Sequence, residues 1–193
     1  MGRLSFAVSC SSNMNRSMEA HSFLAKKGFT VESYGSGNQV KLPGPSPDKP
    51  NIYDFGVSYN EIYKDLAAKD KQLYTQNGIL HMLERNRRIK ERPERFQDCD
   101  KQFDVVICLE ERVYDQIIED LTAREGEGSG AALHVINLDI QDNHEEATIG
   151  AFFVCELCAL LESCDDLDNE IDEVLTEFES KCSRSILHTV CFY

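Results

Sequence analysis

Short apolar runs recur along the chain, and their spacing predicts strands. In the first run, residues 4–9, apolar and small side chains alternate, as on a strand with one buried face. The run FDVVICLEE, residues 103–111, is almost continuously apolar, which is typical of a strand buried on both faces. We expect strands at residues 4–9, 29–35, 103–111, 133–140 and 185–193.

The segments between these runs have helical spacing. Residues 17–27 place apolar side chains three and four positions apart, and Gly28 is suited to end that helix. Residues 165–180 hold eight acidic side chains, yet their apolar positions trace one face, which predicts a docked amphipathic helix. We expect helices at residues 17–27, 58–90, 112–124, 147–163 and 165–180. Strands that alternate with helices predict a three-layer α/β fold with a mostly parallel sheet, and the last strand is expected at its edge.

The length of 193 residues favours one domain spanning residues 1–193. Residues 36–50, SGNQVKLPGPSPDKP, hold four of the five prolines, so this segment is expected to be a long but stiff loop without a helix or central strand. Residues 51–100 follow as a mainly helical insertion before the buried strand.

The composition limits the classes of partner and the cellular setting. There are 20 Lys and Arg against 34 Asp and Glu, a net charge of −14, which opposes direct binding to nucleic acid or to an anionic membrane. No signal peptide is visible, and no apolar run approaches the ~20 residues that span a bilayer. We therefore expect a reducing intracellular setting, cytosol or nucleus, in which the eight cysteines are free thiols.

The stretch CSSNMNRS, from Cys10 to Ser17, lies between the first predicted strand and the first predicted helix. Backbone N–H groups in such a loop can surround an anion, and the helix adds the positive end of its dipole. Arg16 supplies a planar fork for two oxygens of a tetrahedral anion. Cys10 then faces the phosphorus, and because this field favours the thiolate, Cys10 can act as a nucleophile that forms a cysteinyl-phosphate. Ser17 is placed to hydrogen-bond the thiolate. The predicted phosphate-binding residues are Ser11, Ser12, Asn13, Met14, Asn15, Arg16 and Ser17.

This chemistry needs a proton donor for the leaving alkoxide. Asp139 and Asp142 lie at the end of the 133–140 strand, in NLDIQDNHEE, on the rim that carries the Cys10 segment. We prefer Asp142 as the general acid because it follows the apolar run by two residues. Asp139 is its supporting partner or the alternative acid.

With these residues in hand, the chain resembles the low-molecular-weight tyrosine phosphatase superfold. More closely, it resembles the small cysteine-based phosphatases of the RNA polymerase II C-terminal tail. The matching stretches run along the whole chain and include CSSNMNRSMEAH, VKLPGPSPDKPN, LYTQNGILHMLERN, DIQDNHEEA and LHTVCFY. The resemblance implies a protein-serine/threonine phosphatase that uses neither cofactor nor metal. Its substrate would be the fifth-position phosphoserine of the heptad, followed by a cis proline, in transcription termination and mRNA 3′-end processing.

The resemblance also implies partners and a location. It implies a symplekin-like scaffold, an indirect contribution from a prolyl isomerase, and a nuclear location, with the cytoplasm as a second one. Only about 10–30% of Ser–Pro bonds in a flexible peptide are cis, so an isomerase would speed the supply of substrate. The active-site flap of the family matches the proline-rich segment, at Lys41, Leu42, Pro43, Gly44 and Pro45.

Three alternatives stay open. Arsenate reduction would use the same anion loop but needs two further cysteines, for which CELC at 155–158 is a weak candidate because helical cysteines usually pack as apolar groups. A tyrosine phosphatase would need an aromatic-walled cleft, which the flap does not clearly supply. A non-enzymatic docking protein would bind phosphate without needing Cys10. The basic segment 84–95 is expected to be a solvated helix end, and His144 is a candidate for tuning Asp142.

Overall fold

The computed structural model describes residues 3–193 and has a five-stranded central sheet. Its strands lie in the order β2-β1-β5-β6-β7, of which the first four are parallel and β7 is antiparallel. This confirms the predicted α/β fold with a mostly parallel sheet and a last strand at its edge. The strands are β1 (Ser5–Cys10), β2 (Thr30–Gly35), β5 (Val105–Cys108), β6 (Ala132–Leu138) and β7 (Ile186–Phe192).

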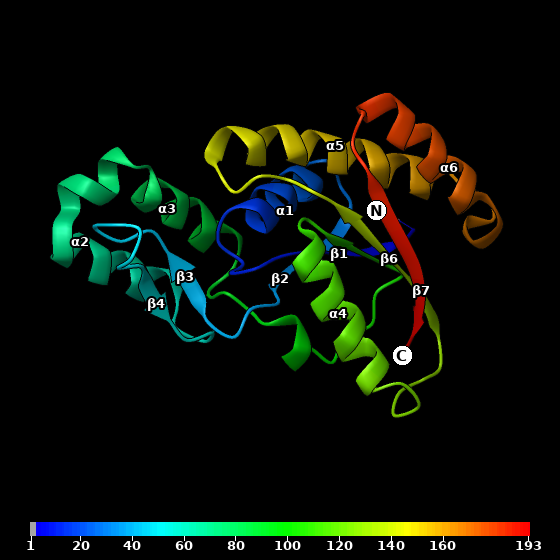
Figure 1. Cartoon of the computed structure of the whole chain (residues 1–193), viewed down its shortest axis with the longest axis horizontal. Coiled ribbons are helices and arrows are strands. Elements are labelled where there is room, and N and C mark those ends of the chain that lie inside the picture. Colours follow the sequence, from blue (N-terminus) through cyan, green and yellow to red (C-terminus); the bar gives the residue numbers. More distant parts are fainter. Residues whose placement is uncertain (1–2) are drawn as a thin grey trace.

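Helices cover both faces of the sheet and complete three layers (Figure 1). One face packs against α1 (Arg16–Lys26), α5 (His144–Glu162) and α6 (Leu167–Cys182). The opposite face packs against α4 (Glu111–Ala123) and a short 3₁₀ helix, η1 (Phe96–Asp98). Because side chains alternate along a strand, neighbouring residues of β5 enter the two different cores, which explains its unbroken apolar run.

The segment between β2 and β5 forms a projecting part beside the sheet (Figure 1). It contains a small antiparallel hairpin, β3 (Val40–Leu42) and β4 (Asn51–Tyr53), and two helices, α2 (Tyr59–Gln76) and α3 (Ile79–Ile89). These four elements share a third core with two methionines, Met14 of the connection between β1 and α1 and Met18 of α1. We call α2 and α3 the helical pair. The core links the helical pair directly to the segment that carries Cys10.

The proline-rich segment departs from its expected form, because residues 40–42 make a strand instead of continuing the loop. A run of three residues is too short for a pattern of alternation to reveal it. Gly44 lies at the turn of this hairpin, where an added Cβ would come within 1.6 Å of the Lys49 carbonyl oxygen. Only glycine lets the two arms of the hairpin approach so closely. In the described part of the chain, no helix has the length and apolar character needed to cross a membrane.

Candidate active site

The connection from β1 to α1 lies at the carboxyl edge of the sheet. Cys10 ends β1, Arg16 begins α1, and residues 11–15 between them are called the Cys10 loop below. The neighbours of β1 are β2 on one side and β5 on the other. The connection that follows β1 leads to β2, and the one that follows β5 leads to β6 on the opposite side. Where two such connections diverge, a crevice opens at the carboxyl ends of the strands, and α/β folds bind ligands there.

The carbonyl groups of this connection are held by other parts of the chain. The carbonyls of Cys10 and Ser11 accept from the amides of residues 36 and 37, at 3.0 Å each. The carbonyl of Asn13 accepts from the hydroxyl of Tyr59 at 2.7 Å. That of Met14 accepts from two side chains of α3, at 3.0 and 2.8 Å. Within residues 3–193, by contrast, none of the amides of the Cys10 loop donates a hydrogen bond. A loop with bound carbonyls and free amides is a nest for an anion.

Asn13 is the structural centre of the Cys10 loop. Its φ of 56° lies in the left-handed region, which asparagine adopts more readily than most residues. Its side-chain amide donates to the Ser17 hydroxyl at 2.9 Å, and its side-chain oxygen accepts from the Glu94 amide at 3.0 Å. The Ser17 hydroxyl also lies 3.1 Å from the sulfur of Cys10, which is the contact expected from the sequence. Asn13 and Ser17 are fully buried, so they lie behind the site and support it.

Arg16 and Asp142 are brought together from distant parts of the sequence. The Nη1 of Arg16 donates to the Ile140 carbonyl at 3.0 Å, and its Nε lies 3.7 Å from Oδ1 of Asp142. Asn15 donates its side-chain amide to the same carboxylate at 2.9 Å. A second carboxylate, Glu110, lies 3.6 Å from Nη2 of Arg16. Sequence reasoning missed Glu110, although it follows β5 at the same edge of the sheet.

The two candidate acids differ in their surroundings. We call residues 139–143, between β6 and α5, the acid loop. Asp139 lies just after β6, not within it as expected, and accepts from the Asn137 side chain at 2.9 Å. It lines a wide groove of about 930 Å³. Asp142 lines this groove and also the smaller cavity that contains Cys10. The geometry therefore places Asp142, and not Asp139, at the cavity that contains Cys10.

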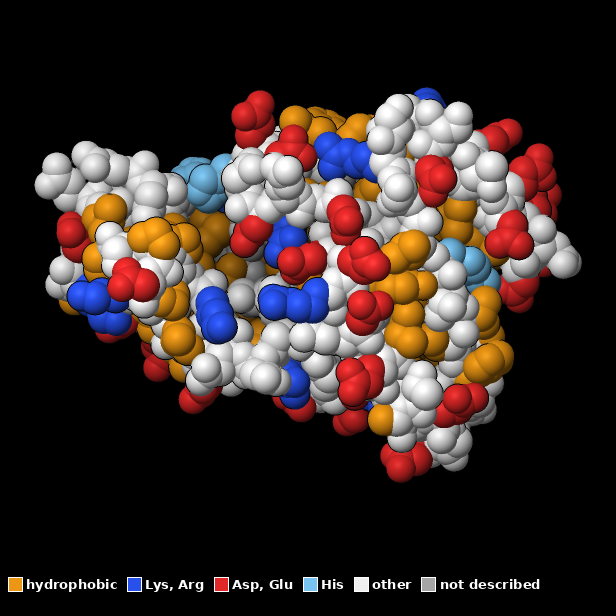
Figure 2. Space-filling view, in the orientation of Figure 1, with side chains coloured by type: hydrophobic (Ala, Val, Ile, Leu, Met, Phe, Trp, Pro, Cys, Tyr) orange, Lys and Arg blue, Asp and Glu red, His pale blue; other side chains and the backbone are white. Residues whose placement is uncertain are grey.

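The cavity at Cys10 has a volume of about 280 Å³ and two unlike walls. One wall carries polar groups of the Cys10 loop and the acid loop, and the other is apolar. Figure 2 shows a hollow on this face with hydrophobic side chains inside it and Lys and Arg side chains beside it. The apolar wall comes from the hairpin and α3, through Leu42, Pro43, Ile79 and Met82.

The predicted flap residues divide into two groups. Lys41, Leu42 and Pro43 line the cavity, and the Lys41 amide donates to the Ser12 hydroxyl at 3.0 Å. Gly44 and Pro45 do not line it; they form the turn behind it. His144 lines the cavity as well, but its Nε2 lies 3.1 Å from the Asn77 carbonyl oxygen, so it bridges to the helical pair instead of contacting Asp142.

The expectation that the basic segment 84–95 is solvated is wrong for its inner members. Arg85 and Lys90 are only 21% and 12% exposed. Arg85 pairs with Glu19 and, with the fully buried Asn86, holds the Met14 carbonyl. The burial of these side chains could not be predicted from the sequence, because it depends on which face of the helix packs against the rest of the protein.

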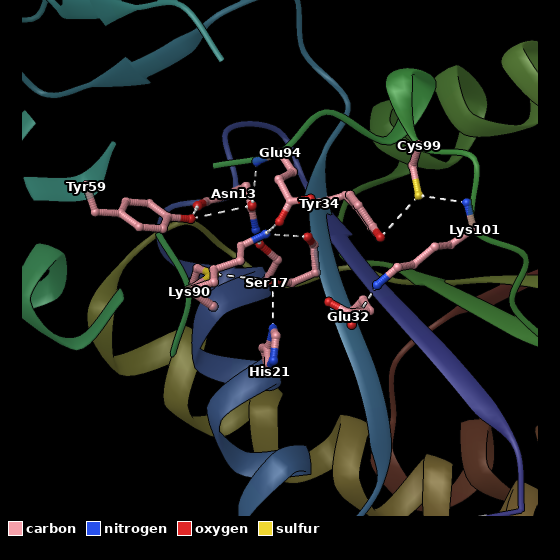
Figure 3. Close-up of polar contacts among 12 residues, drawn as sticks. Asn13, Ser17, His21, Glu32, Tyr34, Tyr59, Lys90, Glu94, Cys99 and Lys101 are labelled. Atoms are coloured by element: carbon pink, nitrogen blue, oxygen red, sulfur yellow. Dashed lines mark hydrogen bonds and ion pairs between the residues drawn. The ribbon is translucent and has the colours of Figure 1, made fainter. Parts of the chain in front are cut away.

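Behind the Cys10 loop lies a polar network that is partly buried (Figure 3). The ammonium of Lys90 donates to the Ser33 carbonyl at 2.7 Å and to Glu94 at 3.1 Å. Burial lowers the pKa of Lys90, and Glu94 opposes that shift. The Nδ1 of His21 lies 2.8 Å from the Ser33 hydroxyl. Burial, together with the positive charge of Lys90, lowers the pKa of His21 to about 4, so this imidazole is neutral at neutral pH.

The remaining cysteines lie away from the cavity. Of the cysteines in residues 3–193, Cys10 alone lines it. Cys155 and Cys158 are buried on α5, and burial raises the pKa of both thiols. The relay needed for arsenate reduction therefore lacks support. In the same described residues, no group of three or more His, Cys, Asp or Glu side chains is arranged to hold a metal ion.

Comparison with known proteins gives consistent matches over the whole chain. The sequence model of the Ssu72-like protein family matches residues 4–193. The RNA polymerase II C-terminal domain phosphatase SSU72 of Danio rerio is 66% identical over 190 residues, covering 98% of this chain and 97% of that protein. The protein of that name from Homo sapiens is 63% identical with the same coverage.

A solved structure matches equally well. It is D. melanogaster Ssu72 with Symplekin, bound to a cis peptidomimetic CTD phospho-Ser5 peptide. Its TM-score is 0.96 at 53% identity, with 100% of both chains covered. A family model that spans nearly the entire sequence, relatives this similar and a site built as described lead to one assignment: this chain belongs to the Ssu72 family.

Proposed function

We propose that this protein removes phosphate from the fifth-position phosphoserine of the RNA polymerase II C-terminal heptad, through a cysteinyl-phosphate intermediate. The observation that carries the proposal is the Cys10 loop, in which the Ser11, Asn13 and Met14 carbonyls are bound and the amides are free, next to a thiol and a buried guanidinium. This is an anion site with a nucleophile inside it. The names and the bound peptide of the close relatives supply the substrate class.

The first chemical step transfers the phosphoryl group to sulfur. The loop amides and Arg16 bind three phosphate oxygens and stabilise the charge that builds up on them. The Cys10 thiolate attacks phosphorus, so a sulfur–phosphorus bond forms and the bond from phosphorus to the serine oxygen breaks. Asp142 gives its proton to that oxygen, which leaves as the serine hydroxyl.

The second step releases inorganic phosphate. A water molecule attacks the phosphorus of the cysteinyl-phosphate while Asp142, now a carboxylate, accepts a proton from it. The sulfur–phosphorus bond breaks, and Cys10 returns as a thiolate. Ser17, 3.1 Å from the sulfur, stabilises that thiolate by donating its hydroxyl proton in a hydrogen bond.

The two walls of the cavity fit a phosphoserine followed by proline. The polar wall takes the phosphate, and the apolar wall of Leu42, Pro43, Ile79 and Met82 takes an uncharged ring. The relative's bound peptidomimetic is a cis form, which supports a cis Ser–Pro bond as the form recognised here. A prolyl isomerase would then act indirectly, by replenishing the cis form.

We extend the proposal to partner and location. The D. melanogaster relative was solved with Symplekin, which supports a symplekin-like scaffold as a partner of this chain. Such a scaffold and a polymerase tail as substrate imply work in the nucleus, in transcription termination and mRNA 3′-end processing.

The test is hydrolysis of phosphorylated heptad peptides in the presence of a metal chelator. Wild type should release phosphate from the phosphoserine–proline peptide, and Cys10→Ser should release none. Asp142→Asn should be about 10²–10⁴-fold slower, equivalent to about 3–5 kcal/mol of barrier. Asp139→Asn is the matched control and should change the rate far less. If Asp139→Asn is the slower variant, the roles of the two acids are reversed.

The same assay separates the alternatives. A faster reaction on a phosphotyrosine peptide than on phosphoserine would favour a tyrosine phosphatase. Binding of phosphopeptide by wild type without any turnover would favour a docking protein. Thiol-dependent loss of arsenate would favour the reductase, although the buried positions of Cys155 and Cys158 oppose it.

A further inference from the structure

Between α6 and the last strand lies an arginine, Arg184, that the proposed mechanism does not use. Ser183 ends α6 with a left-handed φ of 55°, and Arg184 then reaches back toward the acid loop. Its Nη1 donates to the Asp139 carbonyl at 3.2 Å, and its Nη2 donates to Oε2 of Glu146 at 3.2 Å. The guanidinium lies 5.0 Å from the centre of the Phe153 ring.

These two acceptors lie on either side of Asp142. Asp139 begins the acid loop, and Glu146 lies in the first turn of α5, just beyond its end. Asp142 is itself 64% exposed, and its contacts are with Asn15 and Arg16. The position of its carboxylate therefore depends on how firmly the two ends of the acid loop are held.

The chemistry of Arg184 suits it to this task. A guanidinium is a rigid planar fork, so two acceptors bound to different nitrogens are fixed relative to each other. Arg184 and Glu146 are 25% and 28% exposed, so their ion pair is shielded from much of the solvent. An ionised donor also makes stronger hydrogen bonds than a neutral one.

We propose that Arg184 is a positioning residue for the general acid: by clamping both ends of the acid loop, it holds Asp142 where it can protonate the leaving serine oxygen. The proposal rests on the proposed function. Arg184 touches no reacting atom and acts only through the acid loop. Displacing a catalytic group by about 1 Å can lower a rate about 10²-fold, so a loosened clamp has a measurable effect.

The test compares two substrates that differ in their need for a proton. Serine leaves as a strongly basic alkoxide and depends on the acid, whereas p-nitrophenyl phosphate releases a weakly basic phenolate that scarcely does. The quantity compared is kcat/KM, which reports only the first step, because Asp142 serves as the base in the second step for both substrates. Arg184→Met should lower kcat/KM on the phosphoserine–proline peptide about 10–100-fold through kcat, and lower kcat/KM on p-nitrophenyl phosphate less than about 3-fold. Arg184→Lys, which keeps the charge but not the fork, should fall between.

Arg124 offers a matched control for simple loss of stability. It donates to the Cys99 carbonyl at 3.0 Å, pairs with Asp120 at 2.9 Å and lies 5.6 Å from the Phe96 ring centre. It is 28% exposed and lies at the end of α4, away from the acid loop. Arg124→Met should cost similar thermal stability and leave the ratio of the two activities unchanged.

A double variant tests whether Arg184 affects the rate through Asp142. If Arg184 acts through the acid, adding Arg184→Met to Asp142→Asn should slow the peptide reaction by no more than about 2-fold further. Glu146→Gln, which weakens the clamp from its other end, should shift the activity ratio in the same direction and serves if Arg184→Met does not fold.

The proposal is overturned if Arg184→Met lowers kcat/KM equally on both substrates, if it raises KM for the peptide without lowering kcat, or if its effect multiplies fully with that of Asp142→Asn. Failure of the proposed function looks different, because wild type would then not hydrolyse the phosphopeptide at all.

Discussion

Replacing Tyr59 by phenylalanine tests whether the helical pair holds the Cys10 loop in shape. Tyr59 is fully buried, and its hydroxyl donates to the Asn13 carbonyl at 2.7 Å. Tyr59→Phe removes only that oxygen and leaves a buried carbonyl without its partner. An unsatisfied buried acceptor costs about 1–3 kcal/mol of unfolding free energy. For a chain of this size that corresponds to a fall in Tm of about 2–12 °C.

The same change should weaken anion binding, because Asn13 lies in the middle of the loop whose amides we propose to bind the phosphate. If about 1 kcal/mol of the loss appears in binding, the inhibition constant of inorganic phosphate rises about 5-fold. Thermal unfolding and competitive inhibition by phosphate measure the two effects separately.

Tyr193→Phe is the matched control. The Tyr193 hydroxyl accepts from the Phe103 amide at 2.7 Å and is remote from the Cys10 loop. This variant should lose stability and keep the wild-type phosphate constant. The reasoning is refuted if Tyr59→Phe melts at the same temperature as wild type, or if both variants weaken phosphate binding equally.

Three further predictions concern other parts of the molecule. The pKa of His21, about 4 when folded against 6.5 when unfolded, means that its contribution to stability is complete above pH 6.5 and is lost as the pH falls toward 4. Between pH 6.5 and pH 4, the free energy of unfolding of His21→Gln, measured with urea, should therefore fall by about 3 kcal/mol less than that of wild type. An equal dependence of the unfolding free energy on pH in the two proteins would contradict this. At Gly150 an added Cβ would lie 2.2 Å from Cδ1 of Ile140, so Gly150→Ala should lower the free energy of unfolding by about 1–3 kcal/mol and slow phosphoserine hydrolysis by displacing the acid loop. Adding Ile140→Val, which removes Cδ1, should partly restore both properties, and restoration of neither would contradict this explanation. Gly44→Ala should force the two arms of the hairpin apart, because the added Cβ would clash with the Lys49 carbonyl oxygen. The change should raise KM for the phosphopeptide more than it lowers kcat, and an unchanged KM would show that the hairpin does not touch substrate.

Sequence patterns predicted those elements in which the positions of the apolar residues match the faces that are buried. β5 is apolar because both of its faces are buried, and α6 is amphipathic because one of its faces packs on the core. β3 was missed because three residues carry no readable alternation. The break within α2 was also missed: Asp70 has a non-helical φ of −164°, and its side chain accepts from the Leu73 amide, as at the start of a new helix.

The candidate site divides in the same way. Cys10, Arg16 and Ser17 could be predicted as candidates because their chemistry depends on local spacing, and Asp142 because the ends of parallel strands meet at one edge. Tyr59, Arg85 and Asn86 were not found, because a helical tyrosine has the pattern of an ordinary core residue and a helical arginine that of a surface one. Their roles depend on contacts across 46 to 72 positions of sequence, which no local pattern encodes.

These long-range contacts have a consequence for the order of folding. The β1–α1 connection lies near the start of the chain, but the groups that bind the Asn13 and Met14 carbonyls reach them only when the helical pair docks. Contacts between residues so distant in sequence form slowly, since loop entropy is lost before they contribute. Refolding should therefore restore the circular-dichroism signal of the sheet and helices before it restores phosphate affinity. Under the proposed mechanism, activity is therefore acquired late in folding. A chain with the helical pair undocked would have Cys10 at the end of β1 without the complete anion site around it.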